Sequence, residues 1–120
     1  MMSIVLAAAS GACLAASPAQ MEPGFDISGA GARPCSAWTE ARDKMGDRES
    51  SALLDEAMMV TWVQGFLNGM NVSRIAAGGQ PARLPDGDSI RTYVDAFCRR
   101  QPGTRVMQAA LQLYLSNAAR

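Results

Sequence analysis

Residues 88–98, DSIRTYVDAFC, carry the clearest helical pattern in the chain. Five apolar positions recur at i, i+3, i+4, i+7 and i+8, which is the spacing of one face of an α-helix. These positions are Ile90, Tyr93, Val94, Phe97 and Cys98. Asp86 or Asp88 can cap the start of the helix, and Pro102-Gly103 breaks the chain beyond its end. The pattern therefore predicts a helix that buries one side and holds Cys98 in a core.

The polar side of this helix carries Arg91, Asp95 and Arg99 at four-residue steps. Side chains four residues apart are neighbours on a helix surface, so opposite charges at this spacing can pair in solvent. We therefore expect these three residues to form a solvated ladder of ion pairs.

Three further helices are expected around this one. The first covers residues 34–45 and carries Cys35 and Trp38 on one face. The longest covers residues 50–77, and the last covers residues 104–115. The inner face of the last helix comprises Val106, Ala109, Ala110, Leu113 and Tyr114. No segment of comparable strength alternates with period two, so the sequence predicts an all-α, four-helix domain with largely antiparallel neighbours.

The helix expected over residues 50–77 is apolar around most of its circumference. One side of it, at helical spacing, comprises Leu54, Met58, Trp62, Gly65, Phe66, Gly69 and Val72 or Ser73. Met59, Val63, Leu67 and Met70 widen the apolar arc. A helix of this kind is normally central, with the other helices packed around it.

Two glycines, Gly65 and Gly69, lie four residues apart in this long helix. Such spacing lets another backbone or a bulky ring approach closely. Packing against another helix of the same domain is the favoured interpretation, and a hinge is the minor alternative. The residues expected to make helix contacts are Trp62, Gly65, Gly69, Tyr93 and Phe97.

Three polar residues, Asn68, Asn71 and Arg74, follow the more polar side of the same helix. They are candidates for a surface that contacts a protein partner. A plain solvated face is the favoured alternative, because most polar helix faces have no other role.

The N-terminal segment has the features of an export signal. Residues 1–19 contain no Asp, Glu, Lys or Arg, and an apolar run is followed by small residues that end in Ser17-Pro18-Ala19. This pattern predicts a signal peptide cleaved after Ala19. Residues 20–33 would then form a flexible leader, and residues 34–120 the helical domain. The alternative is a buried N-terminal helix of the folded domain.

Cleavage of the signal would remove Cys13 and leave Cys35 and Cys98. Two cysteines in an oxidising compartment usually pair, so we expect one disulfide; two buried free thiols are the alternative. A bridge that closes a loop of roughly 60 residues stabilises a fold by about 4 kcal/mol in the chain-entropy model.

The composition narrows the classes of function. Eleven basic and eleven acidic residues give zero formal charge, which argues against nucleic acid or anionic lipid as the main partner. The chain has no His, which excludes His-based triads and His metal sites. No segment is suited to a stable membrane span, and no pattern indicates a cofactor or metal. We therefore expect a non-enzymatic binding domain, with an enzyme that lacks any sequence motif as the minor alternative.

A set of motifs resembles small periplasmic helical proteins of Gram-negative bacteria. The motifs are Cys35-x-x-Trp38, Trp62-Val63-Gln64-Gly65-Phe66, Asp88-x-Ile90, Tyr93-x-x-x-Phe97-Cys98 and Pro102 before an Ala-rich last helix. Similarity to the Rap/Tai immunity proteins implies an exported domain that binds and blocks a cell-wall amidase toxin of type VI secretion. Residues 50–77 and the loop at 77–85 would then be the occluding elements, with a homodimer as the expected form.

The chain is also similar to the HdeA acid-stress chaperones, which are small periplasmic helical domains with one disulfide. That resemblance implies an unfolded client protein as the partner. Both resemblances imply a periplasmic location and a protein partner.

Overall fold

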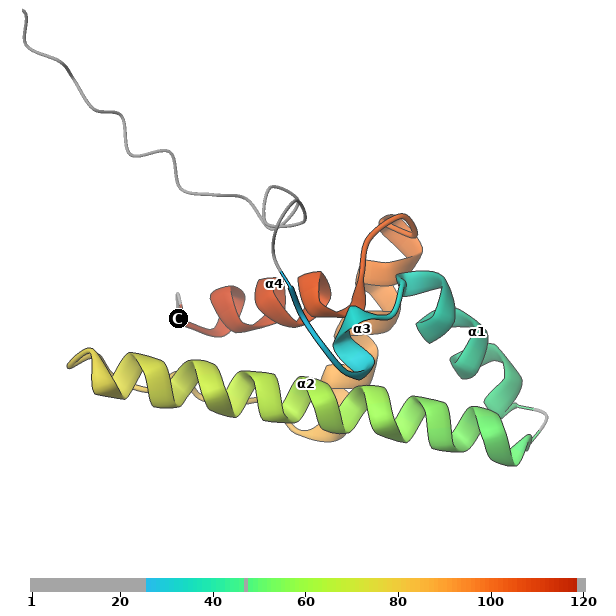
Figure 1. The fold of residues 1–120 in the computed structure, drawn as a ribbon, viewed down its shortest axis with the longest axis horizontal. Helices are drawn as coiled ribbons and strands as arrows, with labels where there is room; N and C mark the ends of the chain where they lie inside the picture. The colour runs from blue at the N-terminus through green and yellow to red at the C-terminus, as the bar shows by residue number, and fades with distance from the viewer. Residues whose placement is uncertain (1–25, 47, 119–120) are drawn as a thin grey trace, which may run out of the picture.

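The computed structural model describes residues 26–46 and 48–118. A short 3₁₀ turn, η2 (Ala30–Ala32), precedes four α-helices, shown in Figure 1. The helices are α1 (Cys35–Met45), α2 (Ser50–Ala76), α3 (Gly87–Arg100) and α4 (Val106–Ala118). The predicted all-α, four-helix fold with one disulfide is confirmed. The predicted signal peptide, residues 1–19, lies outside the described residues.

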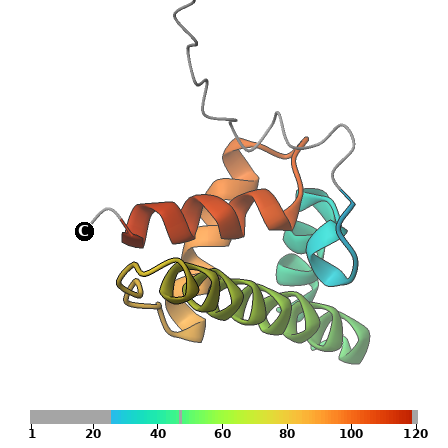
Figure 2. The same cartoon turned by 60° about the vertical axis from the view of Figure 1, so that its left-hand side comes forward.

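Helix α2 is the longest element and contacts η2, α1, α3 and α4. Figures 1 and 2 show α2 along one side of the domain, with α4 beside it and α3 crossing both steeply. In both views α2 and α4 run in the same direction. The expectation of largely antiparallel neighbours is therefore wrong for this pair, because α3 crosses both helices steeply instead of returning alongside α2.

The disulfide joins the start of α1 to the end of α3. Cys35 and Cys98 are 63 residues apart in sequence and 5.0 Å apart between their Cα atoms, and both are buried. The Cys35 N–H also donates to the carbonyl of Thr104 at 2.8 Å, and the Val106 N–H donates to the carbonyl of Arg33 at 3.0 Å. The start of α1, the end of α3 and the start of α4 are thus held together at one point.

The buried faces of α3 and α4 are largely those that the sequence predicts. Ile90, Val94, Phe97 and Cys98 are buried, and Tyr93 is half-buried. All five predicted residues of the inner face of α4 are also buried. The side chain of Asp86 caps α3 by accepting from the Ser89 N–H at 2.8 Å. This hydrogen bond lowers the pKa of the Asp86 carboxyl below its usual value.

The buried side of α2 is not the apolar side on which Leu54, Met58 and Val72 lie. The core side comprises Ala52, Glu56, Met59, Val60, Val63 and Leu67. Leu54, Met58 and Val72 are instead 61%, 54% and 66% exposed. Periodicity alone could not separate the two sides, because both are apolar and only contacts with other helices select one of them.

The expected solvated ladder on α3 is also wrong for two of its three members. Asp95 accepts a hydrogen bond from the indole Nε1 of Trp38 at 2.8 Å, and it also accepts hydrogen bonds from two nitrogens of Arg42. Arg91 donates to Glu56, which is only 3% exposed. Asp95 and Arg91 therefore pair with charged side chains of α1 and α2. Of the three residues of the predicted ladder, only Arg99 is exposed.

The end of the predicted leader is ordered and packs on α2. Trp62 donates from Nε1 to the carbonyl of Ser28 at 3.1 Å and stacks on Phe66 with ring centroids 5.3 Å apart. A Cβ atom on Gly31 would overlap the Trp62 ring. The prediction of a flexible leader is therefore wrong for its last residues, which the bulky indole can approach only because Gly31 lacks a side chain.

Candidate functional site

The outer face of α2 is the side of this helix turned away from the core. Its members, all exposed, are Leu54, Met58, Thr61, Gly65, Gly69 and Val72. They lie at steps of four and three residues, so they form one straight stripe along the helix. Leu53 and Ile75 add exposed apolar surface near its two ends. Contiguous exposed apolar surface is typical of sites that contact another protein, a membrane or a ligand.

The outer face carries no formal charge over most of its length. From Ala57 to Ser73 the sequence contains no Asp, Glu, Lys or Arg. Only uncharged polar groups, those of Thr61, Gln64, Asn68 and Ser73, interrupt the exposed apolar surface there. A partner protein with a strongly charged binding surface would meet no opposite charges on this part of the face.

A shallow depression of about 500 Å³ lies at the N-terminal half of this face. It is lined by Ala30, Leu54, Ala57, Met58, Thr61 and Trp62. The lining is almost wholly apolar, and η2 forms one of its walls through Ala30. An apolar side chain of another protein would fit such a depression better than a charged one.

Gly65 and Gly69 do not pack against another helix of the domain. Within the described part of the chain, nothing lies within 4 Å of a Cβ atom built on either glycine. The favoured prediction of intramolecular packing at these two positions is therefore wrong. The glycines instead leave a flat centre on the outer face, between the large side chains of Met58 and Val72.

Asn71 has an internal role, contrary to its prediction as a partner-surface residue. Its Nδ2 donates to the carbonyl of Ala82 at 2.9 Å, and its Oδ1 accepts from the Ala82 N–H at 2.8 Å. The same Oδ1 accepts from the hydroxyl of Tyr114 at 2.9 Å. Asn71 therefore fixes the loop over residues 77–86 to both α2 and α4. Asn68 remains exposed, as the prediction requires.

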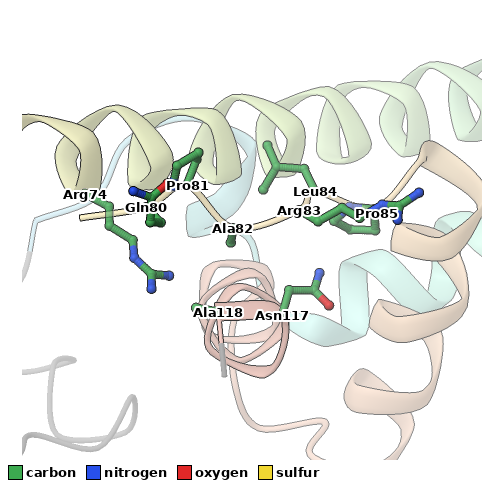
Figure 3. A pocket seen from close by; sticks show the side chains of 9 residues that line it. All are labelled: Arg74, Gln80, Pro81, Ala82, Arg83, Leu84, Pro85, Asn117 and Ala118. Carbon is green, nitrogen blue, oxygen red and sulfur yellow. The ribbon is translucent and has the colours of Figure 1, made fainter. Parts of the chain in front are cut away.

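The loop over residues 77–86 borders a second depression, of about 530 Å³, shown in Figure 3. Arg74, the third predicted surface residue, lines it at one end, and Arg83 lines it at the other. Because the two guanidinium groups do not converge in Figure 3, they do not form a single anion site. The loop itself is extended and largely exposed, and Pro81 and Pro85 restrict its backbone.

No protein-family model, curated protein or solved structure matches this chain. The function of the chain is therefore inferred from its own residues and their geometry. Among the described residues, no group of three His, Cys, Asp or Glu side chains could hold a metal ion. No described helix is both long enough and apolar enough to cross a bilayer.

Replacing Asn71 with alanine is expected to lower the free energy of unfolding by about 2 kcal/mol, because three hydrogen bonds of roughly 1 kcal/mol each are lost and water replaces them in part. Urea unfolding measures this change, and amide exchange at Ala82 reports the release of the loop. Asn68→Ala, on the exposed side of the same helix, is the matched control and should change stability by less than about 0.5 kcal/mol. Equal losses in the two variants would show that Asn71 does not fix the loop.

Proposed function

We propose that this chain is an exported, periplasmic domain that acts by binding another protein and has no catalytic activity of its own. The observation that supports the proposal is the exposed, charge-free outer face of α2. Leu54, Met58 and Val72 are exposed to water, so the free energy that burial of these side chains would contribute is not realised in the domain alone. Contact with another protein would bury them.

The other half of the proposal concerns catalysis and compartment. Glu56, the buried carboxylate of the described core, pairs with Arg91 and lies 3.9 Å from Arg42, so it contributes to the packing of α1, α2 and α3. The Cys35–Cys98 disulfide favours an oxidising compartment such as the periplasm.

We further propose an immunity role, in which the partner is a cell-wall amidase toxin delivered by type VI secretion. The loop over residues 77–86 supports this role because it is exposed, restricted by two prolines and fixed by Asn71. A loop held in one conformation loses little entropy when it enters an enzyme cleft, which favours tight occlusion.

The immunity role is tested by challenge with sibling cells that carry the amidase toxin. A deletion strain is expected to lyse, and the wild-type gene should restore survival. Arg83→Glu, at an exposed position of the loop, should fail to restore it, whereas Arg99→Glu, at an exposed position of α3, should succeed. Survival of the deletion strain at the wild-type level would exclude the immunity role.

An acid-stress chaperone is the second candidate, and the contacts of α3 favour it. Carboxylates hold this helix to its neighbours, since Asp95 binds Trp38 and Arg42 and Glu56 binds Arg91. A chaperone of this kind requires that acid loosens the fold and exposes core surface to a client protein, and loss of these carboxylate contacts would have that effect. A domain that binds no more hydrophobic dye at about pH 2.5 than at neutral pH is not such a chaperone.

A further inference from the structure

We propose that Met58 is a reversible oxidation site, at which a hydroperoxide converts the thioether on the outer face of α2 into a sulfoxide. The proposal rests on the proposed function, in that it assigns a regulation to the face that contacts the partner protein. The sulfoxide lowers the affinity of this face for apolar surface, and methionine sulfoxide reductase restores it.

Met58 is more accessible to an oxidant than the other methionines of the described chain. Its exposed fraction is 54%, whereas that of Met59, the next residue, is 0% and that of Met107 is 3%. Met45 and Met70 are half-buried. Oxidation of methionine requires access to the sulfur lone pair, so it follows exposure of the side chain. Helix α2 therefore presents one thioether to solvent and encloses the adjacent one.

The position of Met58 on the outer face makes its polarity important. Leu54 and Trp62 lie one helical turn before and after Met58, and all three line the depression of about 500 Å³. The rest of this lining is almost wholly apolar, and no charged residue occurs from Ala57 to Ser73. A sulfoxide at this position would therefore place a strongly polar oxygen inside otherwise apolar surface.

The modification is a two-electron oxidation of the sulfur. A lone pair of the Met58 Sδ attacks the terminal oxygen of the hydroperoxide, and the O–O bond breaks as the S–O bond forms. The proton of the transferred oxygen passes to the departing oxygen, which leaves as an alcohol, or as water when the oxidant is hydrogen peroxide. In the reverse direction a reductase removes the sulfoxide oxygen as water, and two of its thiols are oxidised to a disulfide.

Oxidation of Met58 changes the outer face without adding a polar group to the core. In the free domain the sulfoxide oxygen remains hydrated, because the side chain is more than half exposed. In a complex that covers the face, the same oxygen would lose its water without gaining a hydrogen-bond donor from apolar surface. A sulfoxide at the fully buried Met59 would instead disrupt the core. The two neighbouring residues thus separate control of binding from damage to the fold.

Treatment of the mature protein with hydrogen peroxide tests the site. Met21→Leu provides the background, because every thioether left in the mature protein then lies in the described residues. Peptide mass spectrometry over a time course should detect the sulfoxide of Met58 first, forming at least about tenfold faster than that of Met59. Complete conversion of Met58 should lower the binding of a hydrophobic dye at neutral pH by about threefold or more, with an unchanged midpoint of urea unfolding.

Two variants in the same background show whether Met58 causes the loss. In Met58→Leu, dye binding should be the same before and after peroxide, because leucine has no sulfur to oxidise. Met45→Leu, at a half-buried methionine of α1, is the matched control and should still lose dye binding. Incubation of the oxidised parent protein with both classes of methionine sulfoxide reductase and a thiol reductant should return its dye binding to the untreated level.

Oxidation of Met58 no faster than that of Met59, or dye binding that persists after complete conversion of Met58, would overturn the inference. The toxin challenge separates this inference from the immunity role. Cells that are protected by a chain whose dye binding does not respond to peroxide would overturn the oxidation site alone. A chain that responds as expected to peroxide and gives no protection would overturn the immunity role alone.

Discussion

Replacing both Cys35 and Cys98 with serine is expected to lower the free energy of unfolding by about 4 kcal/mol. The bridge spans 63 residues, and a cross-link over a loop of this length removes a large part of the entropy of the unfolded chain. A small domain has only about 5–15 kcal/mol of stability in total, so this single bond is a major share of it. For a domain of this size the melting temperature should fall by more than about 15 °C.

Thermal and urea unfolding of the mature protein measure this loss, and wild type treated with reductant should reproduce it. Cys13→Ser, within the predicted signal peptide, is the control and should leave the mature protein unchanged. If both sulfurs of the exported protein reacted with an alkylating agent without reductant, the protein would not contain the disulfide. The argument for an oxidising compartment would then fail as well.

Helices α3 and α4 show what the sequence predicts well. On α3 one side is apolar and the other polar, so the helical period alone identifies buried residues such as Ile90 and Val94. On α4 the period identifies the predicted inner face but not Met107 and Gln108, which are also buried. The cap at Asp86 is one of the two that the local sequence offers, and the pairing of Cys35 with Cys98 follows from the number of cysteines left after signal cleavage. Where one physical preference acts alone, the sequence is sufficient to predict the outcome.

The buried side of α2 is harder to predict, because two sides of this helix are apolar and only one of them faces the core. Met59, Val63 and Leu67 serve the core, whereas the equally apolar outer face remains exposed. Periodicity contains no information on which side another element covers. The rule that a uniformly apolar helix is central therefore holds for its contacts within the domain, and it overlooks the apolar side that remains exposed.

The close approach at Gly31 had no local signal. A stretch rich in Gly and Pro is equally typical of a mobile linker and of a backbone that passes close to a large ring. Only the position of Trp62 on α2, far away in sequence, distinguishes the two. The sequence could therefore not predict that the leader ends in an ordered turn.

The buried carboxylate could have been found from the sequence. Glu56, Val60, Val63 and Leu67 follow one another at four, three and four residues, so the glutamate lies on the core side of α2. A buried carboxylate requires a positively charged partner, and an Arg on a neighbouring helix is the usual one. Its partner, Arg91, is an expected neighbour only once α3 is known to cross α2.

Replacing Arg91 with methionine is expected to destabilise the domain by about 3 kcal/mol, because Glu56 would remain buried with only the more distant Arg42 nearby. The double variant Glu56→Met, Arg91→Met should recover part of this loss, since an apolar pair of similar volume leaves no buried charge. Arg99→Met, at an exposed position of the same helix, is the control and should change stability by less than about 0.5 kcal/mol. A double-mutant cycle in urea measures the coupling energy, and strictly additive losses would mean that the Glu56–Arg91 contact does not stabilise the packing of α3 on α2.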